Sequence, residues 1–215
     1  MPPTATSAND SRSGRRAAAR QRLLDAGLSL MAQKGVQACK VEEITAQAGV
    51  AKGTFFTHFA SKEVFVAQLV ESVLDDLSRR VRPLGLAPGE PESLLGAVGS
   101  VYLRYFQLRP AAAALLIQAA GLDPDGPAGA AIRGRLADHL TAMAAMLSPA
   151  AAHLGWPAEH GRELALSLLA TATGFFWFGP RLDLAREMPL NLMDRLGRML
   201  ARGLARRDGG EARGR

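Results

Sequence analysis

The segment Lys40–Glu63, which reads KVEEITAQAGVAKGTFFTHFASKE, restricts the possible folds of this chain more than any other segment. Apolar residues recur in it at helical spacing, first as Val41, Ile44 and Ala48 and then as Phe55 and Phe59. Gly49 stands between the two sets, and glycine readily adopts the positive φ that lets one helix turn sharply across the next. The segment therefore predicts a helix-turn-helix, whose second helix lies in the major groove of duplex DNA.

The second helix of this motif carries polar side chains that can donate to phosphates or base edges, namely Lys52, Thr54, Thr57 and His58. Thr54 and His58 are four residues apart, so they share one face of the helix. Lys62 begins the next predicted helix, where backbone N–H groups also attract anions. This chemistry favours contact with a nucleic-acid backbone.

From about Gly14 to about Val73 the chain resembles the TetR family of bacterial transcriptional regulators. The resemblance is carried by the runs RQRLLDAGLSLMAQKGV, VEEITAQAGVAKGTFFTHF and SKEVFVAQLV. It implies an all-α fold of about nine helices, with an N-terminal three-helix helix-turn-helix DNA-binding domain and a C-terminal helical domain for ligand binding and dimerisation. Beyond about Pro83 the resemblance is one of architecture only.

The resemblance also implies roles for single residues in DNA binding. Thr54 and Thr57 would contact base edges, and His58 and Lys62 would lie near phosphates. The predicted contact set is Lys40, Lys52, Thr54, Phe56, Thr57, His58 and Lys62.

Four positions depart from the family pattern. Lys40 replaces a capping Thr or Ser; it cannot cap, but it can still contact phosphate. Ala51 replaces the common N-cap serine of the second helix, and Phe56 replaces a tyrosine, which keeps the ring without the hydroxyl. Thr45 replaces an alanine, and its hydroxyl is expected to bond back to the carbonyl of Val41.

The domain organisation follows from breaks in the helical pattern. Two prolines and two glycines fall within the seven residues Pro83–Gly89, which predicts the end of a helix and a domain boundary. The expected ranges are a flexible basic arm at 1–13, a DNA-binding domain at 14–60, a connecting helix at 61–82, a ligand-binding and dimerisation domain at 83–207, and a flexible tail at 208–215. Further helices are expected at 91–108, 110–119, 128–147, 157–178 and 189–206.

Large apolar and amphipathic residues in the second half could line an effector pocket between helices. The candidates are Tyr102, Phe106, Leu116, Gln118, His139, Met143, Phe175 and Trp177. Most of these are equally suited to ordinary core packing, and His139 is equally suited to a partly exposed surface position.

The last two predicted helices carry small side chains and an apolar stripe, a pattern typical of helices that pack closely. In the resembling family the matching pair meets its twin across a two-fold axis, which would put Leu168, Thr171, Leu192, Leu196 and Leu200 in a dimer interface. The alternative is that both stripes face the core of their own subunit.

Composition is consistent with a DNA-binding regulator and offers no enzyme signature. The net charge is +6, which favours polyanionic partners, and the single cysteine, Cys39, fits a reducing cytoplasm. The four histidines lack metal-ligand spacing, no phosphate-binding glycine loop or nucleophile motif occurs, and no stretch is suited to span a membrane. No catalytic residue, metal site or cofactor is predicted.

These observations predict a homodimeric repressor that releases a palindromic operator when a small, largely apolar effector binds. Two alternatives stay open. One is a helical small-molecule-binding protein, and the other is a DNA-binding adaptor controlled by a protein partner.

Overall fold

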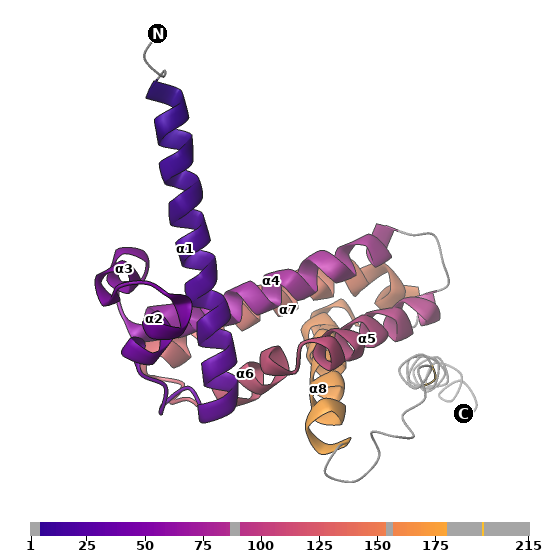
Figure 1. Ribbon diagram of the computed structural model, residues 1–215. Helices are drawn as coiled ribbons and strands as arrows, with labels where there is room; N and C mark the ends of the chain where they lie inside the picture. Colours follow the sequence, from indigo (N-terminus) through magenta and orange to yellow (C-terminus); the bar gives the residue numbers. More distant parts are fainter. Residues whose placement is uncertain (1–4, 87–90, 154–156, 180–194, 196–215) are drawn as a thin grey trace, which may run out of the picture. The chain divides into compact units, whose positions relative to one another are not determined.

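The computed structural model describes residues 5–86, 91–153, 157–179 and Arg195, and every element in that part of the chain is helical (Figure 1). The elements are α1 (Ala5–Lys34), α2 (Val41–Ala48), α3 (Lys52–His58), α4 (Lys62–Leu86), α5 (Pro91–Leu108), α6 (Pro110–Ala120), α7 (Pro127–His153), the 3₁₀ turn η1 (Ala158–His160) and α8 (Gly161–Phe178). The predicted all-α fold is confirmed. The helix expected at 189–206 lies outside the described residues.

The chain divides into two compact units. The first comprises Met1–Val70 and Ala114–Ile132, and the second comprises Glu71–Ala113 and Arg133–Arg215. Helices α4, α6 and α7 each contribute residues to both units.

An aromatic cluster forms the centre of the helix-turn-helix in the first unit. The rings of Phe55, Phe59 and Phe65 lie with centroids 4.8 to 5.3 Å apart, and all three side chains are fully buried. α1 packs against α2 and α3 and buries Leu23 and Met31. Aromatic side chains bury large apolar areas, so these residues fix how α3 is held.

Two glycines make the turns that this packing requires. Gly49 ends α2 with φ 64°, and the N–H of Val50 bonds to the carbonyl of Thr45 at 3.0 Å. Gly35 follows α1 with φ 94°, and its N–H bonds to the carbonyl of Met31. Both positions favour glycine, because a Cβ is strained at positive φ. The predicted turn at Gly49 is therefore present.

In the second unit, α5 packs against α8 (Figure 1). α5 buries Leu95, Val98 and Tyr102, and α8 buries a stripe of small and branched residues that includes Leu164 and Leu168. Gly161 permits close approach to α7, since a Cβ there would lie 3.2 Å from the Cβ of Ala144.

Several helix ends differ from the sequence prediction. α1 begins at Ala5 rather than near Gly14, and α4 and α7 continue through Pro83 and Pro149. Each proline lies in the last few residues of its helix, where a φ near −65° suits the helix and the missing N–H removes only one bond. The prediction that the helices end before these prolines is therefore wrong for both α4 and α7.

Candidate nucleic-acid interface and effector region

α3 has one buried face and one solvent-facing face. Phe55 is buried, while the neighbouring Phe56 is 50% exposed and Thr57 is exposed. Thr54 and His58 are half-buried. The hydroxyl of Thr57 donates to the carbonyl of Gly53 at 3.0 Å, so its oxygen keeps a lone pair for an outside donor.

Lysines around α3 are paired with the acids of α2. The ammonium of Lys52 lies 2.6 Å from Glu42, and the hydrogen bond from Lys52 lowers the pKa of that carboxyl. Lys34, at the end of α1, makes the corresponding contact with Glu43 at 2.5 Å. Both pairs are solvent-exposed, and exposed pairs contribute little to stability and exchange readily for other partners.

The start of α2 shows how Lys40 takes the place of a capping residue. Lys40 has extended backbone angles and makes no side-chain capping bond, because lysine has no acceptor. Its own N–H donates to the carboxylate of Glu43 at 3.0 Å. Ala51 likewise leaves α3 without a side-chain cap. The hydroxyl of Thr45 donates to the backbone carbonyl of Glu42 at 3.1 Å. The expected hydrogen bond to the carbonyl of Val41 is therefore wrong.

Lys62 has an intramolecular partner. Its ammonium donates to the carbonyl of Gln37, in the loop between α1 and α2, at 2.9 Å. Because this bond ties the start of α4 to that loop, Lys62 has a structural contact besides the predicted phosphate contact.

Two arginines of α1 lie beside α3 and belong to the candidate interface. Arg20 donates to the side chain of Gln68 at 2.9 Å and lies over the ring of Phe59, and Arg16 lies 3.5 Å from the carbonyl oxygen of Thr57. Burial, followed by these two positive charges, lowers the pKa of His58. Neither arginine is in the predicted DNA contact set, although their four-residue spacing on one helix face was a usable signal.

In the second unit a buried histidine links three helices. The ring nitrogens of His139 on α7 each lie 3.0 Å from a hydroxyl, Nδ1 from Ser78 on α4 and Nε2 from Tyr102 on α5. His139 is only 5% exposed, so the alternative of a partly exposed surface position is wrong. Burial lowers its pKa to about 4 and raises that of Tyr102, so both groups are neutral at pH 7.

The remaining candidates for an effector pocket fall in different places. Phe106 and Met143 are buried in the second unit, and Phe175 and Trp177 on α8 are half-buried. Leu116 and Gln118 belong to the first unit. The side-chain oxygen of Gln118 accepts a hydrogen bond from the N–H of Val36 at 3.0 Å, which connects α6 to the loop before α2.

The predicted dimer residues are only partly described. Leu168 is 4% exposed within the single chain, and Thr171 is half-buried with its hydroxyl on the carbonyl of Ser167. The large apolar side chains that α8 exposes are Leu166, at 45%, and Phe178, at 59%. Leu192, Leu196 and Leu200 lie outside the described residues.

The part of the chain that the structure describes holds neither a metal-ligand cluster nor a membrane-spanning helix. No cluster of three or more His, Cys, Asp or Glu side chains could hold a metal ion there. None of the helices in the same part has the length and hydropathy needed to cross a membrane.

Comparison with known proteins points to one family. Residues 23–69 match the family model described as bacterial regulatory proteins, tetR family. The chain is 39% identical over 62 residues to the HTH-type transcriptional repressor DhaR of Mycobacterium sp. (strain GP1), covering 29% of this chain and 31% of DhaR. It is 34% identical over 84 residues to the HTH-type transcriptional repressor KstR2 of Rhodococcus jostii (strain RHA1), covering 39% of each protein. The chain thus spans well under half the length of these curated relatives.

Solved structures show the same fold over most of the chain. A transcriptional regulator from Rhodococcus sp. Rha1 superposes with a TM-score of 0.68 at 23% identity, covering 87% of this chain and 96% of that one. FadR from Bacillus subtilis, solved in complex with stearoyl-CoA, superposes with a TM-score of 0.67 at 17% identity, covering 86% of this chain and 97% of FadR.

Proposed function

The chain belongs to the tetR family of bacterial regulatory proteins, and from that premise we propose that it is a transcriptional repressor that binds operator DNA through α3. The observation that carries this proposal is the two-sided character of α3. Its buried face is fixed by the phenylalanine cluster, while Phe56 and Thr57 are exposed and Thr54 is half-buried. A recognition helix needs both properties.

Electrostatics around α3 support backbone contacts to DNA. Lys40 precedes α2 and Lys52 begins α3, and both are exposed, while Arg16 and Arg20 lie beside His58. When DNA binds, a phosphate would replace Glu42 as the partner of Lys52. Phosphate contacts of this kind fix register, and Thr54 and Thr57 would then supply base-edge contacts.

We further propose that a small, largely apolar effector binds in the second unit and releases the DNA. The fold is shared with a regulator that was solved with stearoyl-CoA, which supports an effector bearing a long acyl chain. Phe106 and Met143 offer apolar surface, and the pair of His139 and Tyr102 offers the polar groups that fix a ligand's orientation. Because coupling is reciprocal, operator DNA would weaken effector binding by the same factor.

Operator recognition would require two copies of the chain. A two-fold dimer presents two copies of α3 to half-sites about 34–36 Å apart or a multiple of that spacing, so the operator would be palindromic. Selection of duplexes from a randomised pool by the purified protein would recover sequences with two-fold symmetry if this is right.

The decisive variants are Lys52→Gln and Lys34→Gln. Both lysines pair with a glutamate of α2, at 2.6 and 2.5 Å, but only Lys52 belongs to the predicted contact set. We expect Lys52→Gln to weaken binding to the selected duplex about tenfold, and to lower the slope of log affinity against log salt by about one. Lys34→Gln should leave both quantities nearly unchanged.

Glu42→Gln provides a test of opposite sign, because it releases Lys52 and removes a negative charge near the DNA. We expect tighter binding at low salt. Equal losses for the two lysine variants, or failure to select any duplex, would contradict the proposal and favour a helical small-molecule-binding protein. Intact DNA binding without any response to acyl-chain ligands in a thermal-shift assay would favour an adaptor controlled by a protein partner.

A further inference from the structure

Arginine supplies three of the six residues that line a small pocket in the second unit. Its volume is about 190 Å³, and its walls come from Arg80 of α4, the α5 residues Val101, Arg104, Tyr105 and Leu108, and Arg109, which follows α5. We call this the arginine pocket.

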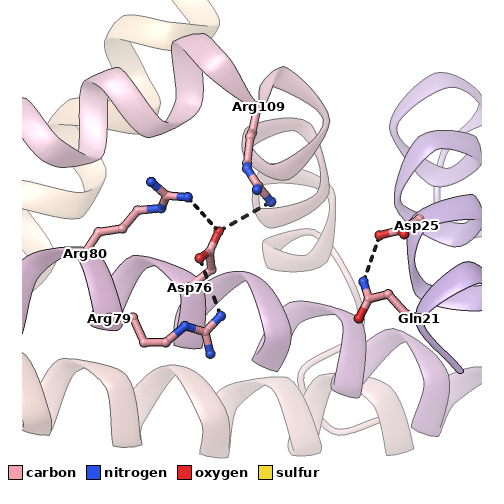
Figure 2. Close-up of polar contacts among 6 residues, drawn as sticks. All are labelled: Gln21, Asp25, Asp76, Arg79, Arg80 and Arg109. Carbon is pink, nitrogen blue, oxygen red and sulfur yellow. Dashed lines mark hydrogen bonds and ion pairs between the residues drawn. The ribbon is translucent and has the colours of Figure 1, made fainter. Parts of the chain in front are cut away.

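Positive charge is in excess around the arginine pocket. The guanidinium groups of Arg79, Arg80 and Arg109 surround the carboxylate of Asp76 (Figure 2). Their nitrogens lie 3.4, 3.5 and 3.4 Å from its oxygens. These contacts are longer than the 2.7–2.9 Å of strong charge-assisted bonds. Oδ2 of Asp76 is buried and accepts no hydrogen bond of good geometry. One loosely held carboxylate therefore faces several guanidinium groups.

The excess matches the charge of a phosphate ester better than that of a carboxylate. Three arginines line the pocket and Asp76 offsets one of them, which leaves two positive charges. A phosphate monoester carries about −1.5 to −2 at pH 7, whereas a carboxylate carries a single charge. Arginine is also suited to phosphate, because its planar fork of donors fits two phosphate oxygens at once.

Tyr105 holds two of the arginines in position. The guanidinium carbons of Arg80 and Arg109 lie 5.4 and 5.7 Å from the centroid of its ring, and the Tyr105 side chain is buried. Cation–π contacts of this kind reduce the freedom of both arginines before any ligand arrives. Pre-organised donors lose less entropy on binding.

The apolar part of the wall indicates what the phosphate is attached to. Leu108 is 70% exposed and Val101 is half-buried, so both offer carbon surface at the pocket. The volume is below the roughly 300–1,000 Å³ of pockets that enclose a drug-sized ligand. It suits a phosphate group with a few carbon atoms.

We propose that the arginine pocket binds the phosphate of a small organic phosphate, with Val101 and Leu108 contacting its carbon skeleton. Binding at this site does not depend on operator recognition. Any effect of the bound phosphate on DNA affinity would rest on the repressor function proposed above.

The test is a calorimetric titration of the full chain with hexyl phosphate, inorganic phosphate and heptanoate in a buffer free of phosphate and sulfate. We expect hexyl phosphate to bind most tightly, since only it satisfies both the charge and the apolar wall. Leu108→Ser should reduce the advantage of hexyl phosphate over inorganic phosphate. Equal binding of heptanoate and hexyl phosphate would overturn the assignment to phosphate.

Arg104→Gln and Arg79→Gln form a matched pair of variants. Arg104 lines the pocket, whereas Arg79 contacts the same Asp76 without lining it. We expect Arg104→Gln to weaken hexyl phosphate binding about tenfold and Arg79→Gln to change it less than twofold. Equal losses in the two variants would mean general attraction by the arginines and would overturn the site.

A final arm separates a small phosphate from the phosphates of DNA. The same two variants are titrated with the duplex selected by the wild-type chain. Loss of duplex binding by Arg104→Gln with unchanged hexyl phosphate binding would assign the arginines to DNA and overturn the proposal. Failure of the repressor function would leave the calorimetric result unaffected, so the two failures are distinguishable.

Discussion

His139 shows how one buried residue can make the stability of the second unit depend on pH. Its two ring nitrogens lie 3.0 Å from the hydroxyls of Ser78 and Tyr102. A neutral imidazole has one donor and one acceptor, and hydroxyls can serve either role, so both contacts are satisfied in the uncharged form. Protonation would place a charge among apolar side chains, which is why burial depresses the pKa.

The sign of the pH effect follows from the two pKa values. The pKa is about 4 in the folded chain and about 6.5 in the unfolded chain, so the unfolded state binds more protons between these limits. The contribution of His139 to stability is complete above pH 6.5. It is lost as the pH falls toward 4, by roughly 3 kcal/mol in total.

Thermal unfolding between pH 7.5 and 4.5 checks this prediction in the wild-type chain and in His139→Gln. Glutamine keeps a donor and an acceptor but does not titrate. We expect a shallower fall of the melting temperature in the variant. Superimposable pH profiles would show that His139 does not titrate with a depressed pKa.

At the scale of the elements, the packing of α1 depends on the absence of a side chain at Gly27. A Cβ at this position would lie 2.3 Å from Cζ of Phe65, a ring within the aromatic cluster. Gly14 lies in the same helix and is exposed. A Cβ added there would have no other atom within 4 Å. Substituting each glycine with alanine therefore separates the effect of packing, at Gly27, from the effect of helix propensity, at Gly14.

We expect Gly27→Ala to destabilise the chain by about 1–3 kcal/mol, because the Phe65 ring must move. Gly14→Ala should be neutral or stabilise it by up to ~1 kcal/mol, because alanine is the better helix former. Urea denaturation followed by circular dichroism measures both. A Gly27→Ala variant as stable as the wild type would show that the cluster can relax without cost.

The start of α4 and the turn after α2 were readable from sequence, because both depend on local chemistry. Positive φ at Gly49 and the hydrogen bond from Val64 N–H to the Ser61 hydroxyl at 3.3 Å involve residues close in the chain. The ends of α4 and α7 were not readable, since packing sustained the helix beyond Pro83 and Pro149. Local propensity is outweighed wherever a helix has tertiary partners.

On the scale of the whole molecule, the proposed dimer would use the exposed face of α8. Leu168 is buried within the chain, whereas Leu166 and Phe178 are exposed large apolar side chains of α8 and are available to a second copy. We expect Leu166→Glu to shift the chain from dimer to monomer, because a buried unpaired charge is costly. Light scattering after size exclusion measures the mass.

Val64→Glu is the matched control, because Val64 is also an exposed apolar residue but lies at the start of α4. It should leave the dimer intact. A monomeric wild-type chain, or a dimer unaffected by Leu166→Glu, would place the interface elsewhere and would remove this argument for a palindromic operator.

The sequence by itself determined the helical class and the helix-turn-helix, and it predicted the exposure of Lys52 and Thr57 on α3. Each depends on spacing along one helix or on the backbone freedom of one glycine, and both are local properties. Only the tertiary structure placed Ser78 and Tyr102 on the two nitrogens of His139, or brought Arg80 onto the ring of Tyr105. Those contacts join residues far apart in the chain, and no spacing rule connects them. They form because folding buries apolar faces, and the packing that results decides which polar groups meet.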